Sequence, residues 1–248
     1  LPIVRLCNDK AARYWVRPIR RYQPWKWWHS LTGLFITIEG PDGSGKSTQM
    51  VRLCHLLEQR GFSVVQTREP GGTVIADKIR GLLLDPLHCE MTSRTEALLY
   101  MAARAQHAAQ LIRPALAAGA VVISDRFADS SLVYQGVARG LSQVDLVWLN
   151  RFAAEGLTPD LTLLLDGTVE RLAERLAERG NRDRLDREGM AFHRRVRQGF
   201  LELAASEPDR IKVVEADRDV EAVWADIKAC VTDFLMKRGR SHAVTDQQ

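Results

Sequence analysis

Long apolar runs are missing from this sequence of 248 residues. The longest apolar stretches have the length of a strand and fall well short of the roughly 20 residues that a membrane-spanning helix needs. Cysteine is also scarce: the 4 cysteines are scattered without C-x-x-C spacing or nearby histidine pairs, so neither a disulfide framework nor a zinc site is expected. This pattern is typical of reduced thiols, and we expect a cytoplasmic protein.

Basic charge is concentrated at the start of the chain. The first 30 residues hold seven Lys or Arg against Asp9 alone, together with four of the 6 tryptophans, so the rest is slightly acidic although the formal net charge is +4. No specific nucleic-acid partner is therefore expected for the folded part. We interpret residues 1–32, which show no helical or strand period, as an extension that is poorly ordered or lies upstream of the true start. Contact of this extension with an anionic membrane or single-stranded nucleic acid, or a role as a transit peptide, remains open.

Beyond residue 33, short continuous apolar runs alternate with longer amphipathic stretches. This pattern indicates strands that are covered on both faces and joined by helices. We expect an α/β fold in one domain, 33–238, with a five-stranded parallel sheet, helices on both faces, and a flexible tail at 239–248. The expected strands are 34–39, 63–67, 120–124, 161–166 and 211–214, and the expected helices are 46–60, 73–84, 94–118, 129–137, 142–155, 168–179, 187–206 and 219–236.

A glycine-rich turn follows the first expected strand and opens the first helix. It matches G-x-x-x-x-G-K-[ST], a loop whose backbone N–H groups converge on a polyphosphate at the positive end of a helix. Lys46 adds a mobile charge there, and Ser47 offers a hydroxyl to Mg²⁺. The sequence therefore predicts an ATP or GTP site made of Gly40, Pro41, Asp42, Gly43, Ser44, Gly45, Lys46, Ser47 and Thr48.

Charged residues also follow other strands, at the edge of the sheet where ligands bind. Asp125 ends the third strand, from which a carboxylate reaches phosphate-bound Mg²⁺ directly or through water, and Arg126 would meet a second phosphate. A local ion pair between the two is the alternative, which the P-loop disfavours.

The third helix carries a pattern of its own. Ser93 and Glu96 match an S-x-x-E capping box, which predicts where the helix starts. Tyr100, Arg104 and His107 then fall on one face. The ring of Tyr100 lies one turn from the guanidinium of Arg104, so this face could bind a nucleobase by stacking and hydrogen bonding. The alternative is that the face only packs against the protein interior, and this is how we interpret His107.

Arginines gather in the connector around Gly180 and Asn181. Such a segment is usually a solvated loop, but an Arg-rich lid can supply charge to a transferring phosphoryl group. The arginines are Arg175, Arg179, Arg182, Arg184 and Arg187.

Three further motifs are more discriminating than the P-loop. They are Thr67-Arg68-Glu69-Pro70-Gly71-Gly72-Thr73, Asp125-Arg126 with Asp129-Ser130-Ser131 and Tyr134-Gln135-Gly136, and Pro159-Asp160-Leu161-Thr162. With them, residues 33–236 resemble the thymidylate kinases. The resemblance implies a homodimeric P-loop nucleoside monophosphate kinase that transfers the γ-phosphoryl group of MgATP to dTMP, giving dTDP and ADP in dTTP biosynthesis.

The resemblance also implies a role for each matching residue. Asp42 would approach the sugar 3′-OH, Tyr100 would stack on thymine, Arg104 and Gln135 would contact the base edge, and Ser131 the base or a bound water. Arg80 and Arg126 would bind the monophosphate, Tyr134 would disfavour a 2′-OH, Glu69 would lie near the metal and phosphates, and Ser47 and Asp125 would hold Mg²⁺. The catalytic set would be Lys46, Arg126, Arg179, Arg182 and Arg184.

The sequence departs from the family's commonest motif residues at few positions. Phe127 follows Asp-Arg in place of Tyr or His, and Tyr100 stands where Phe is frequent; both keep a ring. Members of the family place an arginine either in the phosphate loop or in the lid. Because Gly43 occupies the loop position, this sequence resembles the basic-lid type.

Other functions remain as alternatives. A deoxynucleoside kinase would need a carboxylate base near a neutral 5′-OH, whereas Arg80 and Arg126 favour a phosphate there. A GTPase is disfavoured because the sequence contains no N-K-x-D motif. A catalytically silent P-loop scaffold is disfavoured by the intact set Lys46, Ser47 and Asp125.

Overall fold

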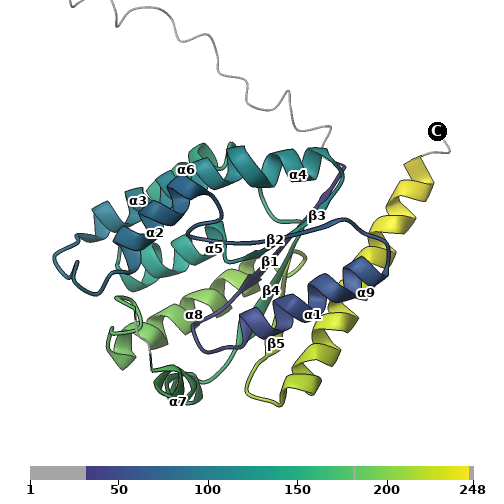
Figure 1. Ribbon diagram of the computed structural model, residues 1–248. Coiled ribbons are helices and arrows are strands. Elements are labelled where there is room, and N and C mark those ends of the chain that lie inside the picture. The colour runs from purple at the N-terminus through teal and green to yellow at the C-terminus, as the bar shows by residue number, and fades with distance from the viewer. Residues whose placement is uncertain (1–31, 181–182, 246–248) are drawn as a thin grey trace, which may run out of the picture.

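The computed structural model describes residues 32–180 and 183–245. A five-stranded parallel sheet runs through its centre in the order β2-β3-β1-β4-β5 (Figure 1). The expected sheet is confirmed, and each strand lies within one residue of its predicted position. The strands are β1 (Leu34–Glu39), β2 (Val64–Arg68), β3 (Val121–Asp125), β4 (Leu161–Asp166) and β5 (Ile211–Glu215).

Side chains of the central strand β1 alternate between two cores. Ile36 and Ile38 pack with residues of the helices α1 (Lys46–Gln59) and α9 (Val220–Thr245). Phe35 lies in a separate cluster on the opposite face. Figure 1 shows α1 beside α9 on one side of the sheet, while α4 (Arg113–Ala117) and α8 (Met190–Ser206) lie on the other. Helices therefore cover both faces, as continuous apolar strands require.

The remaining helices follow the expected order. None of the helices within the described residues combines the length and apolar character that crossing a bilayer requires. They are α2 (Val74–Leu84), α3 (Ser93–His107), α4 (Arg113–Ala117), α5 (Ala128–Ser131), α6 (Gln143–Ala153), α7 (Val169–Arg179) and α8 (Met190–Ser206), with π-helical segments η2 (Ala108–Ile112) and η3 (Leu132–Ala138).

The π-helical segments interrupt two helices that were expected to be regular. The expected helix 94–118 is divided by η2, directly before Pro114, whose ring cannot fit an unbroken α-helical ladder. The expected helix 129–137 changes to π geometry after Ser131. There the carbonyl of Leu132 accepts a hydrogen bond from the Gln143 side chain at 3.0 Å.

The predicted capping box of α3 is wrong. The N-cap is Thr92, whose hydroxyl accepts a hydrogen bond from the N–H of Thr95 at 3.3 Å, and Ser93 is already helical. Glu96 does not reach back to the cap, because its carboxylate is buried among two arginines and a glutamine. The local pattern marked the start of the helix correctly to within one residue.

The last helix is longer than expected. α9 continues past residue 236 to Thr245, so it includes much of the segment 239–248 that was expected to be a tail. Near the expected end of the helix, the guanidinium of Arg238 donates to Asp160 Oδ1 at 2.6 Å. Asp160 Oδ2 in turn accepts from the N–H of Phe35 at 2.8 Å, at the start of β1.

Candidate active site

The P-loop joins β1 to α1 and is shaped by glycines. At Gly40, with φ +134°, an added Cβ would lie 2.3 Å from the carbonyl oxygen of Leu165, so only glycine fits between β1 and β4. Lys46 folds back over the loop and donates to the carbonyls of Gly40 at 3.1 Å and Pro41 at 2.9 Å. Burial and the charge of Arg126 lower the pKa of Lys46. The loop therefore holds a desolvated cation at the positive end of α1, as an anion site requires.

A polar cavity, which we call the phosphate pocket, adjoins this loop. Asp125 lies in it, and the Asp125 Oδ1 atom is buried without a hydrogen-bond partner among the described residues. Ser47 faces the same cavity from the first turn of α1. A free carboxylate oxygen beside a hydroxyl is an oxygen donor set that fits Mg²⁺. The lining residues are Asp42, Gly43, Gly45, Lys46, Ser47, Arg68, Glu69, Arg80, Asp125 and Arg126.

Arg126 is held in an unusual conformation at the end of β3. Its φ is +72°, in the left-handed region that a residue with a Cβ rarely occupies. The backbone is fixed on both sides: Arg126 N–H donates to Ile38 O at 3.0 Å, and Ser124 Oγ donates to Arg126 O at 2.7 Å. Backbone strain of this kind is typical of functional positions.

The guanidinium of Arg126 is fixed as firmly as its backbone. It donates to Asp42 at 2.8 Å, Ser130 at 3.1 Å and Tyr134 at 3.2 Å, and it lies over the Tyr134 ring at 5.1 Å. Burial raises the pKa of Asp42, but the charges of Arg126 and Lys46 outweigh it and hold that pKa well below the usual range. The Asp42 carboxylate is therefore ionised, and it forms ion pairs with both Lys46 and Arg126.

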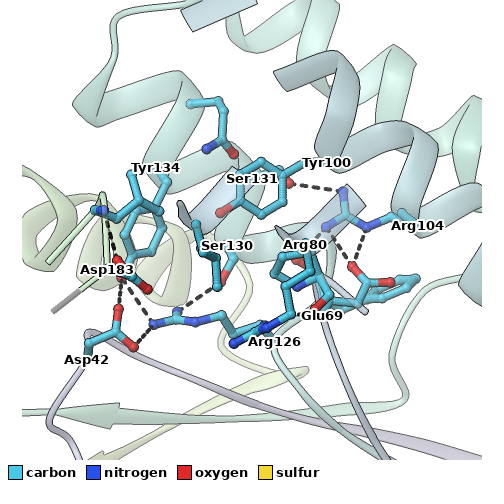
Figure 2. Close-up of a pocket in the computed structure, with 15 residues that line it drawn as sticks. Asp42, Glu69, Arg80, Tyr100, Arg104, Arg126, Ser130, Ser131, Tyr134 and Asp183 are labelled. Atoms are coloured by element: carbon cyan, nitrogen blue, oxygen red, sulfur yellow. Dashed lines mark hydrogen bonds and ion pairs between the residues drawn. The ribbon is translucent and has the colours of Figure 1, made fainter. Parts of the chain in front are cut away.

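A second cavity, which we call the aromatic pocket, continues from the phosphate pocket and shares with it Asp42, Glu69, Arg80 and Arg126. Figure 2 shows Tyr100 and Ser131 on one side of it and the Asp42–Arg126 pair on the other. Arg80 is oriented by a hydrogen bond to the carbonyl of Pro70 at 2.9 Å. The lining residues are Asp42, Glu69, Pro70, Arg80, Leu84, Tyr100, Arg104, Arg126, Phe127, Ser130, Ser131, Tyr134, Gln135, Asp183 and Leu185.

Arg104 forms the buried wall of the aromatic pocket. Its guanidinium donates to Glu69 Oε2 at 2.8 Å, Ser131 Oγ at 3.0 Å and the carbonyl of Phe127 at 3.0 Å, and it also bonds to Asn150. Glu69 binds His107 through its other oxygen at 3.0 Å. His107 thus packs in the interior, as expected. Both carboxylate oxygens of Glu69 accept hydrogen bonds from side chains of α3, one from Arg104 and one from His107.

The predicted lid arginines are placed only in part. Arg182 lies outside the described residues, and α7 ends at Arg179, whose side chain is not described. Arg184 contacts Glu96 of α3 in an ion pair of 2.6 Å and donates to the carbonyl of Leu83 at 2.9 Å. In this structure Arg184 therefore ties its segment to α2 and α3, beside the aromatic pocket.

Sequence reasoning missed the contribution of Glu39. This carboxylate at the end of β1 accepts from the N–H of Phe127 at 2.7 Å and from Ser130 Oγ at 2.6 Å, and so supports both residues around Arg126. Burial, together with the charge of Asp129, raises the pKa of Glu39 to about 7. The signal available in the sequence was a carboxylate at the last position of a mainly apolar strand.

The comparisons with known proteins agree with this arrangement. The sequence profile described as "Thymidylate kinase" matches residues 38–227. A thymidylate kinase of Exiguobacterium sibiricum is 47% identical over 210 residues, which cover 85% of this chain and 99% of the relative. One from Pseudomonas putida is 51% identical over 205 residues, covering 83% and 98%.

A solved structure shows the same fold. The crystal structure of thymidylate kinase from Ehrlichia chaffeensis matches with a TM-score of 0.65 and 31% identity, and the match covers 81% of this chain and 98% of that one. The profile match includes the P-loop, Arg126 and the residues that line the aromatic pocket. The chain belongs to the thymidylate kinase family.

Proposed function

We propose that the protein transfers the γ-phosphoryl group of ATP to dTMP and releases dTDP and ADP. The observation that carries this proposal is the position of Arg80 and Arg126, which line both the phosphate pocket and the aromatic pocket. A nucleoside monophosphate with its base near Tyr100 would place its phosphate at these cations. That phosphate would then face the γ-phosphate of a nucleotide held by the P-loop.

The proposed roles follow the two cavities. The P-loop, Gly40 to Thr48, binds the ATP phosphates, with Lys46 as its charged member. On the dTMP side, Tyr100 stacks on the base, Arg104, Ser131 and Gln135 line the base end, Tyr134 and Asp42 lie near the sugar, and Arg80 and Arg126 bind the phosphate. Glu69 belongs to this side through its bonds to Arg104 and His107.

Mg²⁺ is part of the proposal, with Ser47 and Asp125 as its protein contacts. The unpartnered Oδ1 of Asp125 in the phosphate pocket supports this assignment. When bound, the ion would neutralise charge on the ATP phosphates. Few protein ligands are needed, since Mg²⁺ keeps waters and takes the remaining oxygens from phosphates.

The reaction asks for positioning and charge rather than for a general base. The phosphate of dTMP is already a nucleophile, so no proton has to be removed from it before attack. Arg126 is held by three hydrogen bonds before substrate arrives, and this preorganisation lowers the reorganisation needed during transfer. The surrounding buried residues limit the access of water, which would otherwise compete as acceptor.

The negative charge on the transferring phosphoryl group would be neutralised by the lid, through the guanidinium groups of Arg179, Arg182 and Arg184. Position 43 supports this proposal, because Gly43 has φ +83° and an added Cβ would lie 2.7 Å from the carbonyl oxygen of Leu172. An arginine at that position in the P-loop would clash with α7. The cation must therefore come from another segment.

A kinetic assay with two acceptors tests the proposed function. ADP release is measured with dTMP and with thymidine at equal concentrations. We expect turnover with dTMP and little with thymidine. The variant Lys46→Met, which should be inactive, controls for contaminating kinases. Equal use of thymidine and dTMP would identify a deoxynucleoside kinase instead.

We also propose that two copies of the chain form a dimer through α6. Its residues Val144, Val147, Trp148 and Phe152 lie along one helical face and are exposed, Phe152 to 71%. The rings of Trp148 and Phe152 stack with centroids 5.6 Å apart. Contiguous exposed apolar surface marks a protein interface.

Light scattering tests this interface. The wild type should be a dimer, and Trp148→Glu should be a monomer. Val51→Glu on α1 is the control and should remain a dimer. A dimer that persists in Trp148→Glu would contradict this interface.

The compartment and the N-terminal segment complete the proposal. A cytoplasmic location is supported by Cys54, Cys89 and Cys230, which are free thiols in the structure. The expected extension, and with it any membrane or nucleic-acid contact, falls on residues 1–31, which lie outside the described part of the chain.

A further inference from the structure

Glu96 of α3 lies behind the wall of the aromatic pocket. It is 1% exposed and is not among the residues that line the pocket, whereas Gln135, which does line it, donates from Nε2 to Glu96 Oε1 at 2.9 Å. Glu96 Oε2 forms ion pairs with Arg139 at 3.2 Å and Arg184 at 2.6 Å, and Arg139 Nε also donates to Oε1 at 3.4 Å. One buried carboxylate thus connects α3, η3 and the segment after α7.

The surroundings keep this carboxylate ionised. Burial raises the pKa of Glu96, but the hydrogen bond from Gln135 and the arginines Arg139 and Arg184 outweigh it, so the pKa lies below its ordinary value. An ionised carboxylate has no proton to donate and only accepts hydrogen bonds. Every group that faces Glu96 must therefore present a donor.

This requirement fixes the orientation of the Gln135 side chain. An amide can usually be turned by 180° with little change in shape, and its hydrogen-bond partners decide which way it points. Here the NH₂ group has to face Glu96. The amide atom left for the pocket is Oε1, and no hydrogen bond to it is found among the described residues. The pocket therefore offers an acceptor at this point.

We propose that Glu96 is a positioning residue that sets the hydrogen-bond polarity of the base pocket by orienting Gln135. The inference rests on the proposed function, because it concerns the choice among pyrimidine monophosphates. Thymine and uracil carry an N–H donor at ring position 3, which the Gln135 oxygen can accept. Cytosine carries a lone pair there, and two acceptors facing each other in a buried site exclude it.

The substitution Glu96→Gln should invert this polarity without changing the size of the side chain. Arg139 and Arg184 are donors only and both pair with Oε2, so the carbonyl of the new amide must take the place of Oε2 and its NH₂ group must take the place of Oε1, facing Gln135. The longer bond from Arg139 Nε to Oε1 is lost in this arrangement. Gln135 then has to turn, because two NH₂ groups cannot bond to each other. Its own NH₂ group would enter the pocket, where it matches cytosine and opposes thymine.

The test is a comparison of kcat/KM for dTMP, dUMP and dCMP in the wild type and in Glu96→Gln. We expect the ratio of dTMP to dCMP to fall by about tenfold or more, since a good donor-to-acceptor match is exchanged for a clash. The ratio of dTMP to dUMP should stay within about twofold, because both bases carry the same edge. Ratios depend only on active enzyme, so partial unfolding does not mimic the effect.

Further variants separate polarity from general damage. Arg139→Gln removes the ion pairs of Arg139 with Glu96 and Glu188 but leaves the Glu96 carboxylate, and Glu96→Asp keeps an acceptor-only group; both should retain the wild-type ratio of dTMP to dCMP. If Glu96→Gln does not fold, the double variant with Arg184→Gln removes the guanidinium that loses its carboxylate partner, whereas Arg139 stays paired with Glu188 at 2.6 Å and still presents donors. This double variant should show the same fall in the ratio.

The outcomes also separate this inference from the proposed function. A wild type that phosphorylates neither dTMP nor dUMP contradicts the proposed function. A wild type that is active on dTMP, together with an unchanged ratio of dTMP to dCMP in the variants that lack the carboxylate, overturns the role of Glu96 alone. Equal falls in both ratios would overturn it as well.

Discussion

Replacing Arg126 by lysine removes the geometry of its guanidinium and keeps the charge. In the wild type three protein groups orient this guanidinium, Asp42, Ser130 and Tyr134, and hold it at the boundary of the two cavities. An ammonium on a flexible stem can satisfy Asp42 but cannot also present two parallel N–H donors to a phosphate. The backbone strain at φ +72° is the same for both residues, so it does not affect the comparison.

The size of the effect follows from the lost hydrogen bonds. A hydrogen bond to a charged group contributes about 1.5–3 kcal/mol, and the lysine loses one to two of them, or about 1.5–6 kcal/mol in the transition state. At about 1.4 kcal/mol per factor of ten, kcat/KM for dTMP should fall by roughly one to four orders of magnitude. Binding of an ATP analogue in the absence of dTMP should change by less than about twofold.

Steady-state kinetics with a coupled assay, together with calorimetry for the ATP analogue, measures both quantities. Arg195→Lys is the matched control, because Arg195 also lies over an aromatic ring, that of Phe192 at 6.0 Å, but outside both cavities. If Arg126→Lys retained more than a third of the wild-type kcat/KM while Arg195→Lys was unaffected, the guanidinium of Arg126 would not be the group that binds the phosphate.

Three further predictions address the lid, Glu39 and the N-terminal segment. Arg182→Ala should lower kcat by at least two orders of magnitude with little change in the affinity for dTMP, which rapid-quench kinetics can measure. A variant that keeps the wild-type kcat would contradict the basic lid. Because the pKa of Glu39 is raised from 4.5 to about 7, the folded state binds more protons in between, so stability should decline as pH rises from about 5 to 7. That decline should be smaller in Glu39→Gln, where Asp186, whose pKa burial raises to about 6, still contributes. Thermal unfolding at several pH values can check this, and an identical pH profile in both proteins would refute it. Deleting residues 1–31 should leave kcat and Tm nearly unchanged, and a folded but inactive product would contradict this.

The sequence predicted what local patterns determine. Mainly apolar runs located all five strands, because strands covered on both faces are rich in apolar residues; buried polar members such as Thr37 and Thr162 are hydrogen-bonded to each other. Asp125 and Arg126 could be found because the carboxyl ends of parallel strands meet at one edge, where ligands bind. Glu96 was assigned to a capping box because its spacing from Ser93 fits one, yet its partners Arg139 and Arg184 come from distant segments that no local window includes.

The π-helical segments and the length of α9 were missed for a related reason. A π segment changes only the hydrogen-bond register, and residues such as Gln143 that compensate for it lie outside the segment. The last part of α9 is anchored by the bond between Arg238 and Asp160, which are separated by 78 positions in the chain. Tertiary contacts of this kind decide local structure without leaving a periodic signal.

The order of the strands has a consequence for the time course of synthesis. β1 carries the P-loop and leaves the ribosome first, but it lies in the middle of the sheet, between β3 and β4, and its Ile36 and Ile38 pack with residues of α9, the last helix. At about 5–20 residues per second, the nascent chain waits roughly 10–40 s before α9 can cover them. During that interval the face of β1 and α1 is open to other apolar chains. We therefore expect the emerging protein to need protection until its final helix has been made.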